Sequence, residues 1–154
     1  MSNRLEGRVA VLTGAGSGIG YATSKRLASE GAHVVAVDTN EETGQAIAKE
    51  VGGIFVKADV TNSAQVENMY KVAFDTYGRI DIAFNNAGIS PPDDDSILVT
   101  GIDAWERVLR VNTTSVYLCC KAVIPYMQKA KKGSIINTAS FVATMGAATS
   151  QIAY

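Results

Sequence analysis

The feature that most constrains the fold of this chain is a glycine-rich turn, Thr13-Gly-Ala-Gly-Ser-Gly-Ile-Gly20, which joins an apolar run to an amphipathic one. Without a Cβ atom, glycine lets the backbone turn tightly and lie close to a phosphate group. The N–H groups and the dipole at the start of the following helix favour an anion there. The turn therefore predicts a strand–turn–helix unit that holds a pyrophosphate, with an ordinary tight turn as the alternative. The predicted contacts are Gly14, Ser17, Gly18, Ile19 and Gly20.

The alternation of short apolar runs and longer amphipathic runs continues along the chain. Strands are expected at residues 8–13, 32–38, 54–58, 80–84 and 134–138, and helices at 19–30, 41–51, 63–77 and 103–131. The last helix is expected to be continuous and bent near Pro125. Such alternation predicts an α/β fold, a Rossmann-type doubly wound parallel sheet in the order 3-2-1-4-5. Residues 1–154 suit a single domain.

Composition excludes several classes of protein. Apolar residues make up 47% and charged residues 19%, which suits a packed core rather than a disordered chain. The net charge is −1 and no basic stripe is present, so nucleic-acid binding is not expected. The apolar run at residues 9–12 is too short for a signal segment or a membrane span.

Cysteine and histidine usage argues against a metal site. The two cysteines, Cys119 and Cys120, are adjacent and offer neither a disulfide framework nor metal-ligand spacing. His33 is the one histidine of the chain. We therefore expect a cytoplasmic protein with no metal, no nucleic-acid partner and no membrane association.

Asp38 is expected to decide which dinucleotide binds. It ends the second strand, 18 residues beyond Gly20, where a carboxylate can accept hydrogen bonds from the adenosine ribose. The same charge would repel a 2′-phosphate, by about 4 kcal/mol for unit charges about 4 Å apart at an effective dielectric constant of about 20. Thr39 and Asn40 follow, Ser17 occupies the turn, and we expect no Arg or Lys near Asp38 to hold that phosphate. NAD is predicted over NADP; the alternative is a carboxylate that caps the next helix.

Six stretches of the chain form a pattern that extends over its whole length. They are Thr13-Gly-Ala-Gly-Ser-Gly-Ile-Gly20, Asp59-Val60, Asn85-Asn-Ala-Gly88, Asn112, Ser140 and Tyr154. In identity and order these stretches resemble the short-chain dehydrogenase/reductase family, which has a Rossmann-type fold and nicotinamide-dependent alcohol/carbonyl chemistry.

For the coenzyme, the resemblance implies contacts beyond the glycine turn. Asp59 and Val60 would contact the adenine. Asn86, Ala87 and Gly88 would line the adenosine-ribose side and steady the central sheet.

For the reaction, the resemblance implies that Asn112 holds a water in a proton relay, that Ser140 hydrogen-bonds the substrate oxygen and that Tyr154 is the acid/base. A phenol can give or take the substrate proton, but its ordinary pKa of about 10 is high for neutral pH. In the family a lysine four residues after the tyrosine lowers it, from the same face of a helix.

The implied function is an NAD-dependent oxidoreductase that interconverts a secondary alcohol and a ketone by hydride transfer. The implied substrate is a small molecule, as in 3-oxoacyl reductases or polyol and alcohol dehydrogenases. The helix over residues 103–131 is apolar on more than one face, which favours a homo-oligomer, a dimer or tetramer, in the intact protein.

The sequence departs from the family pattern at its end. It stops at Tyr154, whereas members have about 250 residues, so the lysine position and the substrate loop lie beyond it. We expect the 154 residues to be a fragment with the C-terminal part missing, and with little or no turnover by themselves.

Other interpretations stay open. The chain could be a non-catalytic dinucleotide-binding sensor or pseudoenzyme, or a structural interaction fragment. Ser140 could cap a turn and Asn112 could be an exposed helical residue. The acidic run Asp93-Asp-Asp95 is expected to be a solvated loop at the mouth of the site.

Overall fold

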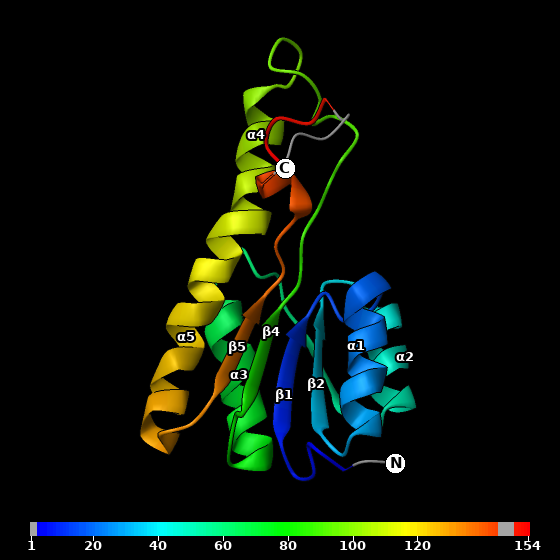
Figure 1. Cartoon of the computed structure of the whole chain (residues 1–154), viewed down its shortest axis with the longest axis vertical. Helices are drawn as coiled ribbons and strands as arrows, with labels where there is room; N and C mark the ends of the chain where they lie inside the picture. Colours follow the sequence, from blue (N-terminus) through cyan, green and yellow to red (C-terminus); the bar gives the residue numbers. More distant parts are fainter. Residues whose placement is uncertain (1–2, 145–149) are drawn as a thin grey trace.

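The computed structural model describes residues 3–144 and 150–154, and within them the chain forms a five-stranded parallel sheet (Figure 1). The strands are β1 Val9–Thr13, β2 His33–Asp38, β3 Ile54–Lys57, β4 Ile82–Asn85 and β5 Ser134–Asn137. Their order, β3-β2-β1-β4-β5, confirms the predicted order. Because every pairing is parallel, the carboxyl ends of the strands meet at one edge of the sheet.

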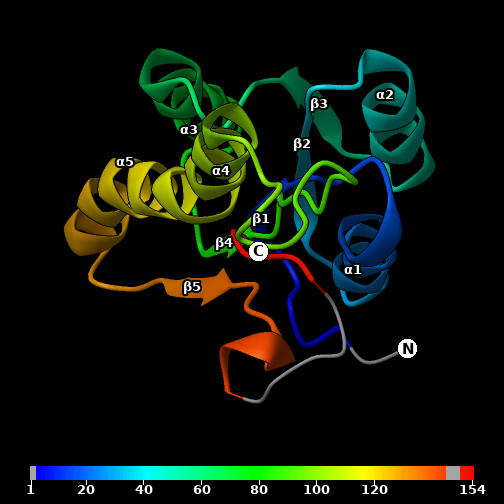
Figure 2. The ribbon, with the colours of Figure 1, turned by 90° about the horizontal axis from the view of Figure 1, so that it is seen from above.

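Helices cover both faces of this sheet (Figure 1 and Figure 2). Helices α1 Gly18–Ser29 and α2 Glu41–Glu50 pack on one face, and α3 Ser63–Tyr77 and α5 Ser115–Ala130 pack on the other. Strand side chains alternate between faces, so Val9 and Val11 of β1 join the α3/α5 core while Ala10 and Leu12 join the α1/α2 core. A strand that is buried on both faces has to be apolar throughout, which explains the continuous apolar runs in the sequence.

Helical turns continue without a break over residues 102–130, which confirms the long helix predicted over residues 103–131. The helix is not α-helical throughout, because a wide turn of π-helix, Arg110–Thr114, joins α4, Ile102–Leu109, to α5. Helix α5 continues through Pro125, so the irregularity lies at the π-turn instead of at the proline. A π-turn inserted between two α-helical segments is often found at a functional site, and this one contains Asn112.

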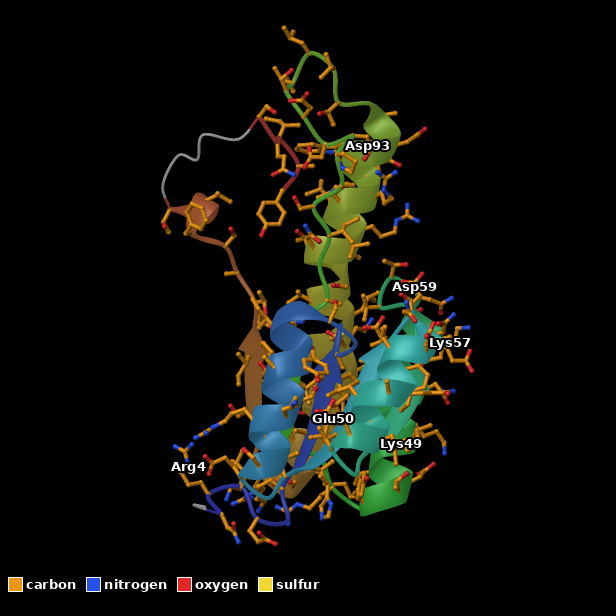
Figure 3. The ribbon with its side chains drawn as sticks, turned by 90° about the vertical axis from the view of Figure 1, so that its right-hand side faces the viewer. Arg4, Lys49, Glu50, Lys57, Asp59 and Asp93 are labelled. Carbon is orange, nitrogen blue, oxygen red and sulfur yellow. The ribbon has the colours of Figure 1, made fainter. Side chains whose placement is uncertain are left out.

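Helix α4, the connection from β4 to α4 and the described part of the chain after β5 form the upper part of the molecule in Figure 1. Figure 3 shows Asp93, in the connection between β4 and α4, at the opposite end of the molecule from Arg4. In the described residues, no helix has the length and hydropathy needed to cross a membrane.

Candidate functional site

The glycine turn connects β1 to α1 in a conformation that requires glycine. Gly14 and Gly18 have φ angles of 64° and 51°, which lie in the left-handed region that favours glycine. A Cβ atom on Gly20 would collide with the Gly14 carbonyl oxygen, because the first turn of α1 packs directly on the loop. A Cβ atom on Gly18 would meet nothing within 4 Å, so at this point the turn faces open space. The turn therefore leaves room for a phosphate group.

Asp38 is oriented by two backbone donors. The N–H of Gly16 donates to Oδ2 at 2.8 Å, and the N–H of Asn40 donates to Oδ1 at 2.9 Å. Asn40 is the N-cap residue of α2, so Asp38 also supports the start of that helix. The two interpretations of Asp38 are compatible, because each carboxylate oxygen retains a second lone pair. Gly16, for which the glycine-rich motif predicts no role, permits this contact, since a Cβ there would collide with Thr43.

A cavity of about 510 Å³ opens beside Asp38. The loop after β3 forms part of its wall with Asp59 and Val60. This loop is held in place because Asp59 Oδ1 accepts hydrogen bonds from the Thr61 N–H at 2.9 Å and the Thr61 hydroxyl at 2.8 Å. Most residues predicted to lie at the adenosine end line this cavity, namely Asp38, Asp59, Val60, Ala87 and Gly88, together with Gly14 and Ser17 of the glycine turn. Asn86, which was also predicted there, lines the neighbouring cavity instead.

Two arginines also line this cavity, contrary to the expectation that no cation lies near Asp38. Arg107 comes from α4 and Arg110 from the π-turn. They are about 70 residues from Asp38 in sequence, and the fold brings them to the same cavity. Arg107 is engaged with Asp93, to which its Nη2 donates at 2.6 and 2.7 Å.

The connection after β4 ties the carboxyl ends of three strands together. Thr13 Oγ1, at the end of β1, accepts hydrogen bonds from the N–H groups of Asn86 at 3.0 Å and Ala87 at 3.1 Å. The Asn86 side chain donates to the Thr13 carbonyl oxygen at 3.2 Å and accepts from the Thr138 hydroxyl, beyond β5, at 3.2 Å. Residues 86–88 therefore form a fixed wall of the cavity and also brace the sheet.

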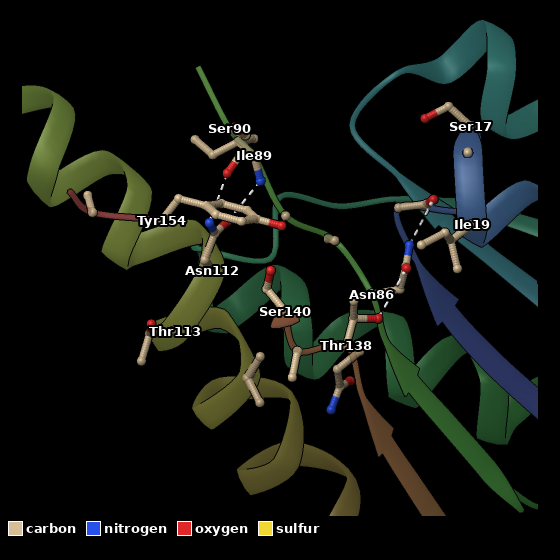
Figure 4. A pocket seen from close by; sticks show the side chains of 18 residues that line it. Ser17, Ile19, Asn86, Ile89, Ser90, Asn112, Thr113, Thr138, Ser140 and Tyr154 are labelled. Carbon is tan, nitrogen blue, oxygen red and sulfur yellow. Dashed lines mark hydrogen bonds between the residues drawn. The ribbon is translucent and has the colours of Figure 1, made fainter. Parts of the chain in front are cut away.

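A second cavity, of about 420 Å³, adjoins the first and contains the predicted catalytic residues (Figure 4). Asn112, Ser140 and Tyr154 all line it, although they lie in the π-turn, after β5 and in the last described segment. Figure 4 shows the Tyr154 ring and the Ser140 side chain facing the same space. The two cavities share one wall, made by Gly14, Ser17, Ala87, Gly88 and Ile89, and Gly18 and Ile19 line the second.

The side chain of Asn112 contacts the backbone of Ile89. Its Oδ1 accepts from the Ile89 N–H at 2.8 Å and its Nδ2 donates to the Ile89 carbonyl oxygen at 2.8 Å. This pair of bonds fixes the loop after β4 against the π-turn. Asn112 is therefore half-buried with its amide paired to backbone, which differs from the alternative of a free exposed side chain.

The expectation that residues 93–95 form a solvated loop is wrong for Asp94. Asp94 is only 2% exposed, and its carboxylate accepts hydrogen bonds from the backbone N–H groups of Ile152, Ala153 and Tyr154. Asp93 is exposed and pairs with Arg107. Three consecutive acidic residues thus have different environments, which a charge pattern alone does not distinguish.

The fold and the site together show to which class of proteins this chain belongs. A parallel sheet with helices on both faces carries a glycine turn, a strand-end carboxylate and adjoining cavities at its carboxyl edge, as Rossmann-type nucleotide-binding proteins do. A family model for short chain dehydrogenase matches residues 8–154. The chain belongs to the short-chain dehydrogenase/reductase family, a family of oxidoreductases.

Similar proteins agree with this assignment. The chain is 40% identical over 153 residues to secoisolariciresinol dehydrogenase of Forsythia intermedia, covering 97% of this chain and 55% of that protein. The structure of levodione reductase superimposes with a TM-score of 0.91 at 34% identity, covering 98% of this chain and 60% of the other. The 3-ketoacyl-(acyl-carrier-protein) reductase of Brucella melitensis, in complex with NADH, gives a TM-score of 0.86 at 35% identity, covering 91% and 59%. The chain thus spans 55–60% of the length of these three relatives.

Proposed function

We propose that the intact protein, meaning the full translation product that contains this chain, is a nicotinamide-dependent oxidoreductase that interconverts a secondary alcohol and a ketone. The observation that carries the proposal is the pair of adjoining cavities. Asp38 lines one, Ser140 and Tyr154 line the other, and the glycine turn belongs to their common wall. An extended dinucleotide fits this arrangement, with its pyrophosphate at the open side of Gly18. A related reductase of similar fold binds NADH, which supports the same coenzyme class here.

The residues of the second cavity suit proton transfer to and from a substrate oxygen. The bound coenzyme supplies the hydride acceptor for oxidation, or the hydride donor for reduction. Tyr154 takes the hydroxyl proton when the alcohol is oxidised and returns it when the ketone is reduced. The Ser140 hydroxyl donates a hydrogen bond to the same substrate oxygen and so holds it near the phenol. The side chain of Asn112 fixes the loop that forms the wall beside them.

We further propose that NAD is preferred over NADP and that the substrate is a small alcohol or ketone of the polyol, alcohol or 3-oxoacyl type. The oriented carboxylate of Asp38 favours ribose hydroxyls over a 2′-phosphate. The intact protein is proposed to be a homo-oligomer, because exposed apolar side chains such as Tyr117 and Ile124 remain on α5.

The test is turnover and coenzyme binding measured on the same intact protein. NADH absorbance at 340 nm is followed with a panel of secondary alcohols plus NAD⁺, and of ketones plus NADH. Tyr154→Phe removes the proton-transferring hydroxyl, so kcat should fall by about 10²-fold or more, while the Kd for NADH, from its fluorescence, should stay within about twofold.

Tyr77→Phe is the matched control, because Tyr77 stacks on His33 away from both cavities. It should leave kcat unchanged. NADH binding without turnover of any panel compound would favour the alternative, a non-catalytic dinucleotide sensor. If the protein binds none of NAD⁺, NADH, NADP⁺ and NADPH, both the oxidoreductase and the sensor are contradicted.

A further inference from the structure

The buried carboxylate of Asp94 makes an unusual set of contacts. Its Oδ1 accepts from the N–H groups of Ile152 at 3.1 Å and Ala153 at 3.0 Å, and its Oδ2 accepts from the N–H of Tyr154 at 3.0 Å. These donors are 58 to 60 residues away in sequence. A carboxylate at 2% exposure is costly to bury unless it is hydrogen-bonded. Hydrogen bonds to a charged acceptor are stronger than neutral ones, so Asp94 and the three amides stabilise one another.

These contacts determine where Tyr154 lies, because its own side chain contributes little anchoring. The Tyr154 residue is 49% exposed, whereas its neighbour Ala153 is 8% exposed. Packing around the ring is therefore incomplete, and the position of the ring depends mainly on the backbone to which it is attached. One further side-chain contact holds the segment, from Gln151 Nε2 to Ser90 Oγ at 2.5 Å.

The loop that carries Asp94 is itself braced. The Asp94 N–H donates to the Pro91 carbonyl oxygen at 3.2 Å, and the Asp95 N–H donates to Thr100 Oγ1 at 2.8 Å. Asp93 binds the Arg107 guanidinium of α4 through both carboxylate oxygens. The carboxylate of Asp94 is thus presented from a fixed loop, which a positioning role requires.

We propose that Asp94 is a positioning residue for Tyr154: through three backbone N–H groups it holds the phenol in the second cavity, next to Ser140, without touching the substrate. This inference rests on the proposed function, since it assigns Tyr154 to proton transfer. A phenol that is displaced by about 1 Å loses the geometry on which proton transfer depends, at a cost of about 10²-fold in rate.

Asp94→Asn tests the proposal with little change in shape. The side-chain amide of Asn has one oxygen that accepts hydrogen bonds and one NH₂ group that cannot accept them. Depending on which of the two replaces Oδ2, either the Tyr154 N–H or the N–H groups of Ile152 and Ala153 lose their acceptor. Asp95→Asn makes the same chemical change one residue away, in a side chain that is not an acceptor for these three amides. Asp94→Glu keeps the charge and both acceptors and moves them by one methylene group.

Three readouts on the intact protein separate the possible results. The first is hydrogen–deuterium exchange of residues 152–154. The second is the ¹³Cζ resonance of Tyr154, assigned with Tyr154→Phe. The third is kcat per folded molecule, measured together with the Kd for NADH. For Asp94→Asn we expect at least 10-fold faster exchange, a displaced Tyr154 resonance and at least 10-fold lower kcat, with the Kd within about twofold. Asp95→Asn should match the wild type in all of these.

Unchanged exchange or an unchanged Tyr154 resonance in Asp94→Asn would overturn the proposal. So would a kcat equal to that of the wild type. If Asp94→Asn does not fold, Asp94→Glu decides, because a positioning role lowers its kcat with unchanged coenzyme Kd, and a merely stabilising role leaves kcat per folded molecule unchanged. If the wild type turns over no panel compound, the proposed function fails, while exchange and the Tyr154 resonance still decide whether Asp94 places the ring.

Discussion

Asp38, Arg107 and Arg110 line the same cavity, so we expect the choice between NAD and NADP to depend on the balance between one carboxylate and two guanidinium groups. Arg107 is bound to Asp93 through both carboxylate oxygens, which directs its charge away from other anions. Asp38 is oriented by Gly16 and Asn40 and keeps lone pairs for further donors. We therefore propose that the carboxylate outweighs the two arginines, and that ribose hydroxyls bind in preference to a 2′-phosphate.

Replacement of Asp38 by Asn should weaken this preference in the intact protein. The loss of one negative charge removes the repulsion of a 2′-phosphate, so the ratio of the Kd values for NADPH and NADH should fall by at least about 10-fold, equivalent to about 1.4 kcal/mol. Coenzyme fluorescence titration measures both constants. Asp103→Asn, at an exposed position of α4, is the control for net charge and should leave the ratio unchanged. The same ratio in wild type and Asp38→Asn would contradict the role given to Asp38.

At the scale of elements, the π-turn at Arg110–Thr114 and the loop after β4 depend on each other. The turn places Asn112 opposite Ile89, and the two hydrogen bonds between them connect the helical layer to the loop that continues to Asp94. The half-buried N–H and carbonyl of Ile89 thereby have partners at a point where neither strand nor helix provides them. The arrangement of the second cavity therefore depends on this contact between two irregular segments.

Asn112→Ala should loosen the loop without unfolding the sheet. It leaves the Ile89 N–H and carbonyl without their partners, which costs about 1–3 kcal/mol locally. Hydrogen exchange at Ile89 should quicken by at least about 10-fold, while amides within β1 keep their protection. Asn68→Ala, an exposed position in the middle of α3, is the matched control and should not change exchange at Ile89. Unaltered exchange at Ile89 in Asn112→Ala would show that the loop is held by other contacts.

The parts of this fold that follow from local patterns were predictable. The apolar runs of β1 and β2, the glycine turn and the helix periods rest on short-range rules, and together they predict the sheet order. The surroundings of Arg107, Arg110 and Asp94 are not local. The two arginines line one cavity with Asp38, about 70 residues away in sequence, and Asp94 accepts from amides 58 to 60 residues away. The π-turn was missed for a different reason, since a helix period continues through it with one extra residue and leaves the apolar pattern nearly unchanged.

For the whole molecule, Asp81 is the polar residue that joins the amino ends of β1, β4 and β5. Its backbone N–H donates to the Val9 carbonyl oxygen at 2.9 Å, and its carbonyl oxygen accepts from the Ser134 N–H at 2.8 Å. Its carboxylate accepts from the Val9 N–H at 3.0 Å, from Arg8 at 2.8 Å and from Arg79 at 2.7 and 2.5 Å. Burial by itself would raise the pKa of Asp81, but the hydrogen bonds from Arg79, Val9 and Arg8 outweigh it and lower the pKa from 3.8 to about 2.

The acid stability of the intact protein should therefore depend on Asp81. A folded-state pKa below the unfolded value means that the unfolded chain binds more protons, so the stabilisation is present above pH 3.8 and is lost as the pH falls towards about 2. The shift corresponds to about 2 kcal/mol. Asp81→Asn should lower the free energy of unfolding at pH 7 by roughly this amount, and the difference from wild type should shrink at pH 2.5. Urea unfolding at both pH values measures this, with Asp75→Asn, at an exposed α3 site paired with Lys71, as the charge control. If wild type and Asp81→Asn differ in free energy of unfolding by the same amount at pH 7 and at pH 2.5, then Asp81 contributes by packing. Its charge would then not be what joins the three strands.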